Sequence, residues 1–230
     1  MMTFMKGRIA MIAVIGIAAF ANSHSGADAE EIRFAPADIE TWDPHRFSGE
    51  TRYRLINTAD GEAVEAVCDD ATASGLFYRE PIDLTRTPVI EWRWRILDPI
   101  SVGDPMTRAG DDYAARLYAV DEHRVLRWRT RALNYVSSTR VAVGEDWPNA
   151  YASQAHMLAV DDAGGDEDAN EAGWQVHRRN LREDFQQFHD RSVDQIDAIA
   201  LMTDCDDTNE RAEVHYGEIR LLPESALNEQ

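Results

Sequence analysis

Short segments in which apolar and polar residues alternate run through most of the chain. Residues 89–97 read VIEWRWRIL, which places Trp92 and Trp94 on one face and Arg93 on the other. A period of two predicts a β-strand with one buried face and one charged face.

Residues 112–120 alternate in the same way. Asp112, Arg116 and Tyr118 lie on one face, and Leu117 lies on the other. The pattern again predicts a half-buried strand, with its polar face available to solvent or to a ligand.

Further strands are expected over 53–58, 62–68, 75–80, 125–129, 132–137, 155–160, 175–179, 196–203 and 212–222. Helical spacing of apolar residues is clearest over 181–189, which predicts one short helix there, and residues 161–171 have a loop-like composition. Many short strands separated by turn residues favour a β-sandwich or a barrel. We see no linker, so residues 30–230 are expected to form one domain.

The first residues have the pattern of a secretory signal peptide. Lys6 and Arg8 precede an apolar run over 9–21, which is shorter than the roughly 20 residues that span a bilayer. We expect cleavage after Ala29, and hence a periplasmic or secreted protein without membrane insertion.

The chain has a formal net charge of −19. Such an acidic surface disfavours nucleic acid and anionic lipid as partners. Lys6 is the only lysine, so the mature chain has no lysine side chain for Schiff-base chemistry. The acidic excess indicates either solubility through charge repulsion or binding of a cation or a basic partner.

Cys68 and Cys205 are the only cysteines. In an oxidising compartment they could form a disulfide, and two unpaired cysteines are the alternative.

Several short fragments stand in a specific order and spacing along the chain: WRW at 92–94, GDDYAARLY at 110–118, NY at 134–135, RN at 179–180, EDF at 183–185, MTDCD at 202–206 and YGEI at 216–219. Together they resemble the domain of unknown function 3047 family of bacterial exported proteins, over about residues 42–222. The resemblance implies an all-β fold, a single antiparallel jelly-roll β-sandwich of the galactose-binding-like type. It implies no established reaction.

The first candidate site is polar and lies on two of the predicted strands. Asp111, Asp112, Arg116 and Tyr118 would form it, and Arg93 could join them if the two strands pair. Such a face suits a sugar, because hydroxyls need donors and acceptors and sugar rings stack on aromatic side chains. It would also suit a carboxylate ligand, or it could be a structural ladder of ion pairs.

The second candidate site is the acidic run that begins at Asp204. Asp204, Asp206 and Asp207 offer the oxygen ligands that calcium prefers, although the spacing is not that of an EF-hand. The alternative is a solvated acidic turn.

The third candidate site is at the start of the predicted helix. Asn180 and Glu183 fit a capping box, whereas Arg179 and Asp184 could instead face a ligand.

We therefore expect an exported, non-catalytic protein that binds an envelope or environmental carbohydrate, with calcium assisting and no organic cofactor. One alternative is a glycan hydrolase that uses Asp112 with Asp204 or Glu218. Another is an envelope scaffold that binds a protein. No motif of nucleophilic or phosphoryl-transfer chemistry is present, and the oligomeric state stays open.

Overall fold

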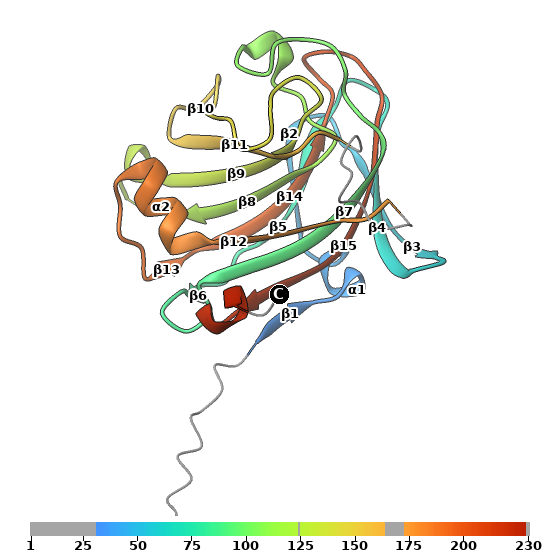
Figure 1. Ribbon diagram of the computed structural model, residues 1–230. Coiled ribbons are helices and arrows are strands. Elements are labelled where there is room, and N and C mark those ends of the chain that lie inside the picture. The colour runs from blue at the N-terminus through green and yellow to red at the C-terminus, as the bar shows by residue number, and fades with distance from the viewer. Residues whose placement is uncertain (1–30, 124, 164–172, 229–230) are drawn as a thin grey trace, which may run out of the picture.

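Two β-sheets pack face to face in the computed structural model, which describes residues 31–123, 125–163 and 173–228 (Figure 1). The order of the first sheet, sheet A, is β12–β7–β15–β4–β3, with β1 also pairing with β15. The order of the second, sheet B, is β10–β11–β9–β8–β14–β5–β2. A third pair, β6 with β13, lies outside both sheets.

The strands of sheet A are β1 (Ile32–Phe34), β3 (Arg52–Thr58), β4 (Gly61–Cys68), β7 (Val89–Asp98), β12 (Gln175–Asn180) and β15 (Ala212–Leu222). Those of sheet B are β2 (Asp43–Ser48), β5 (Ala73–Tyr78), β8 (Arg116–Asp121), β9 (Arg131–Ser137), β10 (Asp146–Pro148), β11 (Ala155–Asp161) and β14 (Ala198–Asp204). The remaining elements are β6 (Ile82–Asp83), β13 (Gln195–Ile196), the helices α1 (Pro36–Ile39) and α2 (Leu181–His189), and the 3-10 turns η1 (Arg108–Gly110), η2 (Arg127–Arg129) and η3 (Glu224–Asn228).

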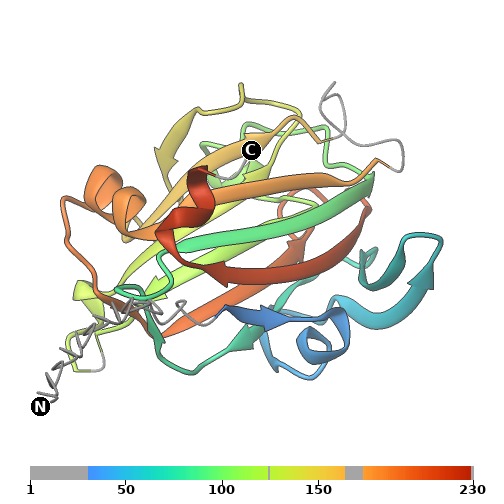
Figure 2. The ribbon, with the colours of Figure 1, turned by 60° about the horizontal axis from the view of Figure 1, so that its bottom comes forward.

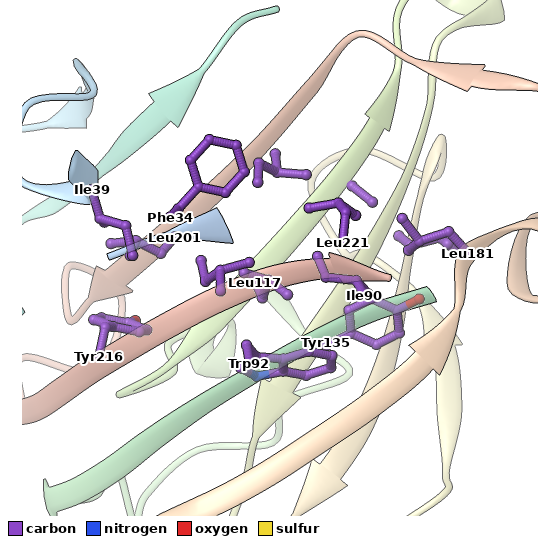
Figure 3. Close-up of a cluster of buried hydrophobic side chains, with 14 of the residues drawn as sticks. Phe34, Ile39, Ile90, Trp92, Leu117, Tyr135, Leu181, Leu201, Tyr216 and Leu221 are labelled. Atoms are coloured by element: carbon purple, nitrogen blue, oxygen red, sulfur yellow. The ribbon is translucent and has the colours of Figure 1, made fainter. Parts of the chain in front are cut away.

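Alternation places one face of each main strand in the core. Figure 2 shows β7 between β12 and β15, and along β7 the side chains of Ile90, Trp92 and Trp94 are buried. From sheet B, Leu117 and Tyr135 meet them (Figure 3), and the Trp92 and Tyr135 ring centroids are 5.1 Å apart. Burial of such large side chains contributes roughly 1.5–3 kcal/mol each, which makes this cluster the main source of sheet-to-sheet cohesion.

Helix α2 has the bounds that the sequence predicts. The Asn180 side chain accepts hydrogen bonds from the backbone N–H groups of Arg182 and Glu183, and Asn180 Nδ2 donates to Glu183 Oε1 at 3.0 Å. The capping interpretation of Asn180 is thus confirmed.

Cys68 and Cys205 form a disulfide, with their Cα atoms 6.0 Å apart. The bond joins the end of β4 in sheet A to the residue that follows β14 in sheet B. It therefore ties the two sheets together directly beside the acidic run at 206–207.

The jelly-roll β-sandwich is confirmed, with three corrections in detail. β9 and β11 pair in parallel, so the sandwich is not wholly antiparallel. The expected strand at 125–129 contains the 3-10 turn η2 instead, and residues 112–115 are irregular, so that β8 starts only at Arg116. The signal peptide at 1–29 and most of the loop at 161–171 lie outside the described residues. Within the described ranges, no helix is long and apolar enough to cross a bilayer.

Candidate functional site

A groove of about 400 Å³ lies over the outer face of sheet B. Its walls come from β2 and from the segment between β10 and β11, and its floor comes from β5, β8, β9 and β14. The lining residues are Phe47, Ala73, Asp111, Arg116, Tyr118, Asn134, Asn149, Tyr151, Ala152, Ala155, Met202, Asp204, Asp206 and Asp207.

The register of the strands fixes the floor. Tyr118 on β8 stands opposite Asn134 on β9 and Ala200 on β14. Arg116 stands opposite Met202 on β14. Because cross-strand partners point to the same side of a sheet, these residues form two adjacent rows on the outer face. The expectation that Arg116 and Tyr118 share a face is confirmed.

Aromatic side chains stand on both sides of the groove. Phe47 is 58% exposed and Tyr151 is 53% exposed. Between them, the half-buried Tyr118 ring lies 6.3 Å from the ring of Phe77, which in turn lies 6.5 Å from Phe47. Exposed aromatic rings beside a polar floor are suited to stacking on a ring-shaped, hydroxyl-bearing ligand.

A buried ion pair underlies one end of the floor. Arg116 Nε donates to Asp204 Oδ1 at 3.0 Å, and Arg116 Nη2 donates both to Asp204 Oδ2 and to the backbone carbonyl of Asp111. Asp204 Oδ1 also accepts the backbone N–H of Tyr113. Burial raises the pKa of Asp204, whereas the Arg116 charge opposes that rise. Since Arg116 and Asp204 are each at most 3% exposed, they act as a structural pair rather than as free ligand groups.

Asp111 connects this ion pair to the groove wall. Both of its carboxylate oxygens accept from Asn149 Nδ2, at 3.1 and 2.8 Å. Asn149 Oδ1 in turn accepts the backbone N–H groups of Tyr151 and Ala152. Burial raises the pKa of Asp111, and Arg116 again opposes the change. The ion pair of Arg116 therefore helps to position the exposed Tyr151, through Asp111 and Asn149.

The acidic run after β14 lies against Asp112. Asp112 Oδ2 accepts the backbone N–H groups of Asp207 and Thr208, at 3.0 and 2.5 Å. Figure 1 shows the corresponding segments, the one after η1 and the turn after β14, at the top of the molecule. One ligand atom from each of Asp112, Asp206 and Asp207 lies within 4.8 Å of the others. Burial raises the pKa of Asp206, as do the neighbouring charges of Asp112 and Asp207.

The structure thus rearranges the predicted metal ligands. Asp206 and Asp207 lie together, but Asp204, the last residue of β14, points to Arg116. Asp112, which the sequence suggested as a ligand contact, takes its place beside Asp206 and Asp207.

Three other predicted contacts lie away from the groove. Arg93 is on sheet A, because β7 pairs with β12 and β15 and not with β8. Its guanidinium lies 4.6 Å from the ring centroid of Trp174, and its side chain crosses Gly217 so closely that a Cβ there would be 2.4 Å from Arg93 Cγ.

Arg179 Nε donates to Asp184 Oδ2 at 2.9 Å, and Tyr135 Oη donates to the same oxygen, so the pair of Arg179 and Asp184 supports the start of α2.

Sequence reasoning missed several groove residues as contacts. Phe47 lies on an exposed edge strand without apolar alternation, and Asn149 and Tyr151 lie in an irregular segment. Asn134 did leave a signal, since it is the polar residue on the otherwise apolar outward face of β9, between Ala132 and Val136. Its Oδ1 atom is buried and has no hydrogen-bond partner.

Comparisons with known proteins concern the family and the fold. The model of the family described as "Protein of unknown function (DUF3047)" matches residues 40–220. No curated protein matches the chain.

Among solved structures, the chain is similar to a family 11 carbohydrate-binding module from Clostridium thermocellum in complex with a β-1,3-1,4-mixed-linked tetrasaccharide. The identity is 11% and the TM-score 0.42, with 84% of this chain and 95% of that chain covered. It is also similar to the low-affinity xylan-binding module CBM86 from Roseburia intestinalis, at 13% identity and a TM-score of 0.34, over 86% and 98% of the two chains. A third such structure is winged bean acidic lectin with methyl-α-D-galactose, at 11% identity and a TM-score of 0.38, over 85% and 100%. The tetrasaccharide and the methyl-α-D-galactose are ligands of those proteins.

Proposed function

The chain belongs to the DUF3047 family, and from this premise we propose that it is a non-catalytic glycan-binding protein whose binding site is the groove over sheet B. One observation carries the proposal. The floor of the groove holds Asn134, a buried amide with an unpartnered oxygen, between walls that present the exposed rings of Phe47 and Tyr151.

A sugar would complement both features. Its hydroxyls are donors and acceptors that suit the polar amide of Asn134 in the groove floor. Its apolar C–H faces could stack on Phe47, Tyr118 or Tyr151. An apolar ligand would satisfy the aromatic walls but leave the amide oxygen unpaired.

The charges of the groove favour a neutral glycan over an acidic one. Among the described lining residues, Arg116 is the basic one, and its donors are engaged by Asp204 and by the Asp111 carbonyl. Asp206 and Asp207 line the same groove and, without a bound cation, would repel a uronic acid or a sulfated sugar. Among the residues that line the groove, the carboxylate-ligand alternative therefore has no free arginine to bind it.

The same contacts favour binding over hydrolysis. A glycosidase needs one carboxylic acid and one free carboxylate beside the scissile bond. Here Asp204 is paired with Arg116, and Glu218 is on β15 of sheet A, where it pairs with Arg33. If the chain is exported, as the N-terminal pattern predicts, envelope or environmental polysaccharides are the glycans it would meet.

The test is retention of the full mature chain by neutral polysaccharides in affinity electrophoresis, followed by calorimetry with soluble oligosaccharides. We expect Tyr151→Ala and Phe47→Ala each to weaken binding by about 1–2 kcal/mol, or roughly 5- to 30-fold. Trp128→Ala is the matched control, because Trp128 is 65% exposed on η2 and does not line the groove. Absence of binding to all neutral glycans, or equal losses in Trp128→Ala, would refute the proposal.

A further inference from the structure

Three carboxylates from two separate segments of the chain converge at one end of the groove. Asp112 follows η1, whereas Asp206 and Asp207 follow the disulfide-bonded Cys205. One oxygen of each lies within 4.8 Å of the others. Oxygens this close together could share one cation such as calcium, which takes oxygen ligands from carboxylates.

An unpartnered oxygen provides independent support. Asp112 is 3% exposed, and its Oδ2 atom has two backbone donors, from Asp207 and Thr208. Its Oδ1 atom is also buried and has no hydrogen-bond partner. A buried carboxylate oxygen is expected to have a donor or a cation beside it, so this atom points to a bound positive charge.

The local charge balance points the same way. The ion pairs of Arg116 go to Asp204 and Asp111. In the part of the chain that the structure describes, no ion pair joins an arginine or histidine to Asp112, Asp206 or Asp207. The second carboxylate cluster, Glu65 with Glu213 and His215, differs in this respect, because Arg54 pairs with Glu65 and Arg211 pairs with Glu213.

We propose that Asp112, Asp206 and Asp207 bind a divalent cation, with calcium as the best match. Hard oxygen donors without nitrogen or sulfur favour calcium or magnesium over zinc, and a surface loop adapts more readily to the flexible geometry of calcium. Three carboxylates leave coordination positions for water, on a side that opens toward the groove, since Asp206 and Asp207 line it.

The proposed cation would also hold the groove wall in place. Tyr151 Oη donates to Asp207 Oδ1 at 2.5 Å, and this bond raises the pKa of Tyr151 to about 12. Fixing Asp207 would therefore fix the ring that the proposed glycan stacks on. Cation binding itself does not depend on the glycan hypothesis, because its evidence comes from the carboxylates alone.

The experiment is calcium titration of the full mature chain after EDTA treatment, by calorimetry and by thermal unfolding. We expect saturable binding of one calcium per chain. At about 100 times Kd, the Tm should rise by roughly 5–11 °C for a chain of this length. Sodium chloride at matched ionic strength should not reproduce the rise, and magnesium should bind more weakly.

Variants locate the site. Asp206→Asn, a substitution of nearly equal size at a half-buried position, should weaken calcium binding by about ten-fold or more. Glu213→Gln removes the same charge from the arginine-paired cluster of sheet A and should leave Kd within about two-fold of the wild type. Asp207→Asn serves as a second variant if Asp206→Asn does not fold.

Two results would overturn the proposal. The first is the absence of any calcium-specific heat or Tm shift in the wild type. The second is a loss of affinity in Glu213→Gln as large as that in Asp206→Asn, which would indicate general charge screening. Neither readout contains a glycan, so failure of glycan binding and failure of this site can be told apart.

Discussion

The outer faces of the two sheets are both polar, yet their side chains are organised in opposite ways. On sheet A, Glu91 accepts hydrogen bonds from Arg178 and Arg220, and Arg93 stacks on Trp174. On sheet B, the charged groups lie at one end, and the rest of the floor carries small, amide and aromatic side chains. Charges that satisfy one another form a solvated surface, whereas unpaired acceptors beside exposed rings form a binding surface. The two faces therefore predict different responses to substitution.

The largest effect is expected where sheet B buries its ion pair. Asp204→Ala would leave Arg116 buried without its carboxylate partner, which typically costs about 3–5 kcal/mol. Chemical denaturation at pH 7 measures this loss. Replacing both partners, by Arg116→Met with Asp204→Leu, should recover most of the stability, because no unpaired charge remains. A loss below about 1 kcal/mol in Asp204→Ala would mean that solvent reaches Arg116 and that the pair is not a buried centre.

The second effect concerns the disulfide bond that joins the two sheets. Replacing both Cys68 and Cys205 with serine opens a loop that spans 137 positions, and we expect a loss of about 2–4 kcal/mol. Unfolding of the oxidised and variant proteins in the same denaturant series measures the difference. Calcium affinity should fall as well, because Cys205 directly precedes Asp206. Unchanged calcium affinity in a folded serine variant would show that the Asp112 hydrogen bonds are enough to hold the loop.

The two faces also show how far the sequence determines the fold. Alternation predicted β15 at its observed bounds, because Val214 and Tyr216 face the core and their neighbours do not. It missed β2, whose edge position leaves its residues exposed and so erases the pattern. At 125–129, apolar and basic residues alternate as in a strand, yet the chain forms a turn there, since Val125 and Trp128 have nothing to pack on and stay exposed.

The candidate site was predictable only within single strands. The spacing of Arg116 and Tyr118 was enough to place them on one face, and that placement is confirmed. Which strand pairs with β8 is a non-local property, so the sequence suggested Arg93 as a neighbour when it is on the other sheet. Asp204 and Asp206 are close in sequence but have different neighbours, because Asp204 still belongs to β14 and binds Arg116, whereas Asp206 belongs to the turn after it.

The third effect tests the arginine-paired face of sheet A by pH. Burial tends to raise the pKa of Glu91, but the hydrogen bonds and charges of Arg220 and Arg178 outweigh it and hold the pKa below its ordinary value. A carboxyl with a lowered pKa stabilises the folded state above the pKa it has in the unfolded chain, and that contribution is lost as the pH falls through its folded pKa. Glu91→Gln should therefore cost about 1–2 kcal/mol at pH 7 and progressively less below about pH 4.5. Denaturation of both proteins from pH 7 to pH 3 measures this difference, and a gap that stays constant with pH would contradict the assignment.

The smallest effect separates stability from binding on the two faces. Arg54 pairs with Glu65 on sheet A, but its side chain is 69% exposed, so solvent screens the pair and it contributes little to stability. Arg54→Ala should therefore change neither the denaturation midpoint nor glycan affinity. Phe47→Ala on sheet B should be equally neutral for stability, because Phe47 is 58% exposed, but it should weaken glycan binding. If Phe47→Ala destabilised the fold as much as it weakened binding, Phe47 would be a packing residue of an edge strand. The contrast between the two faces would then depend on Tyr151 and Asn134 alone.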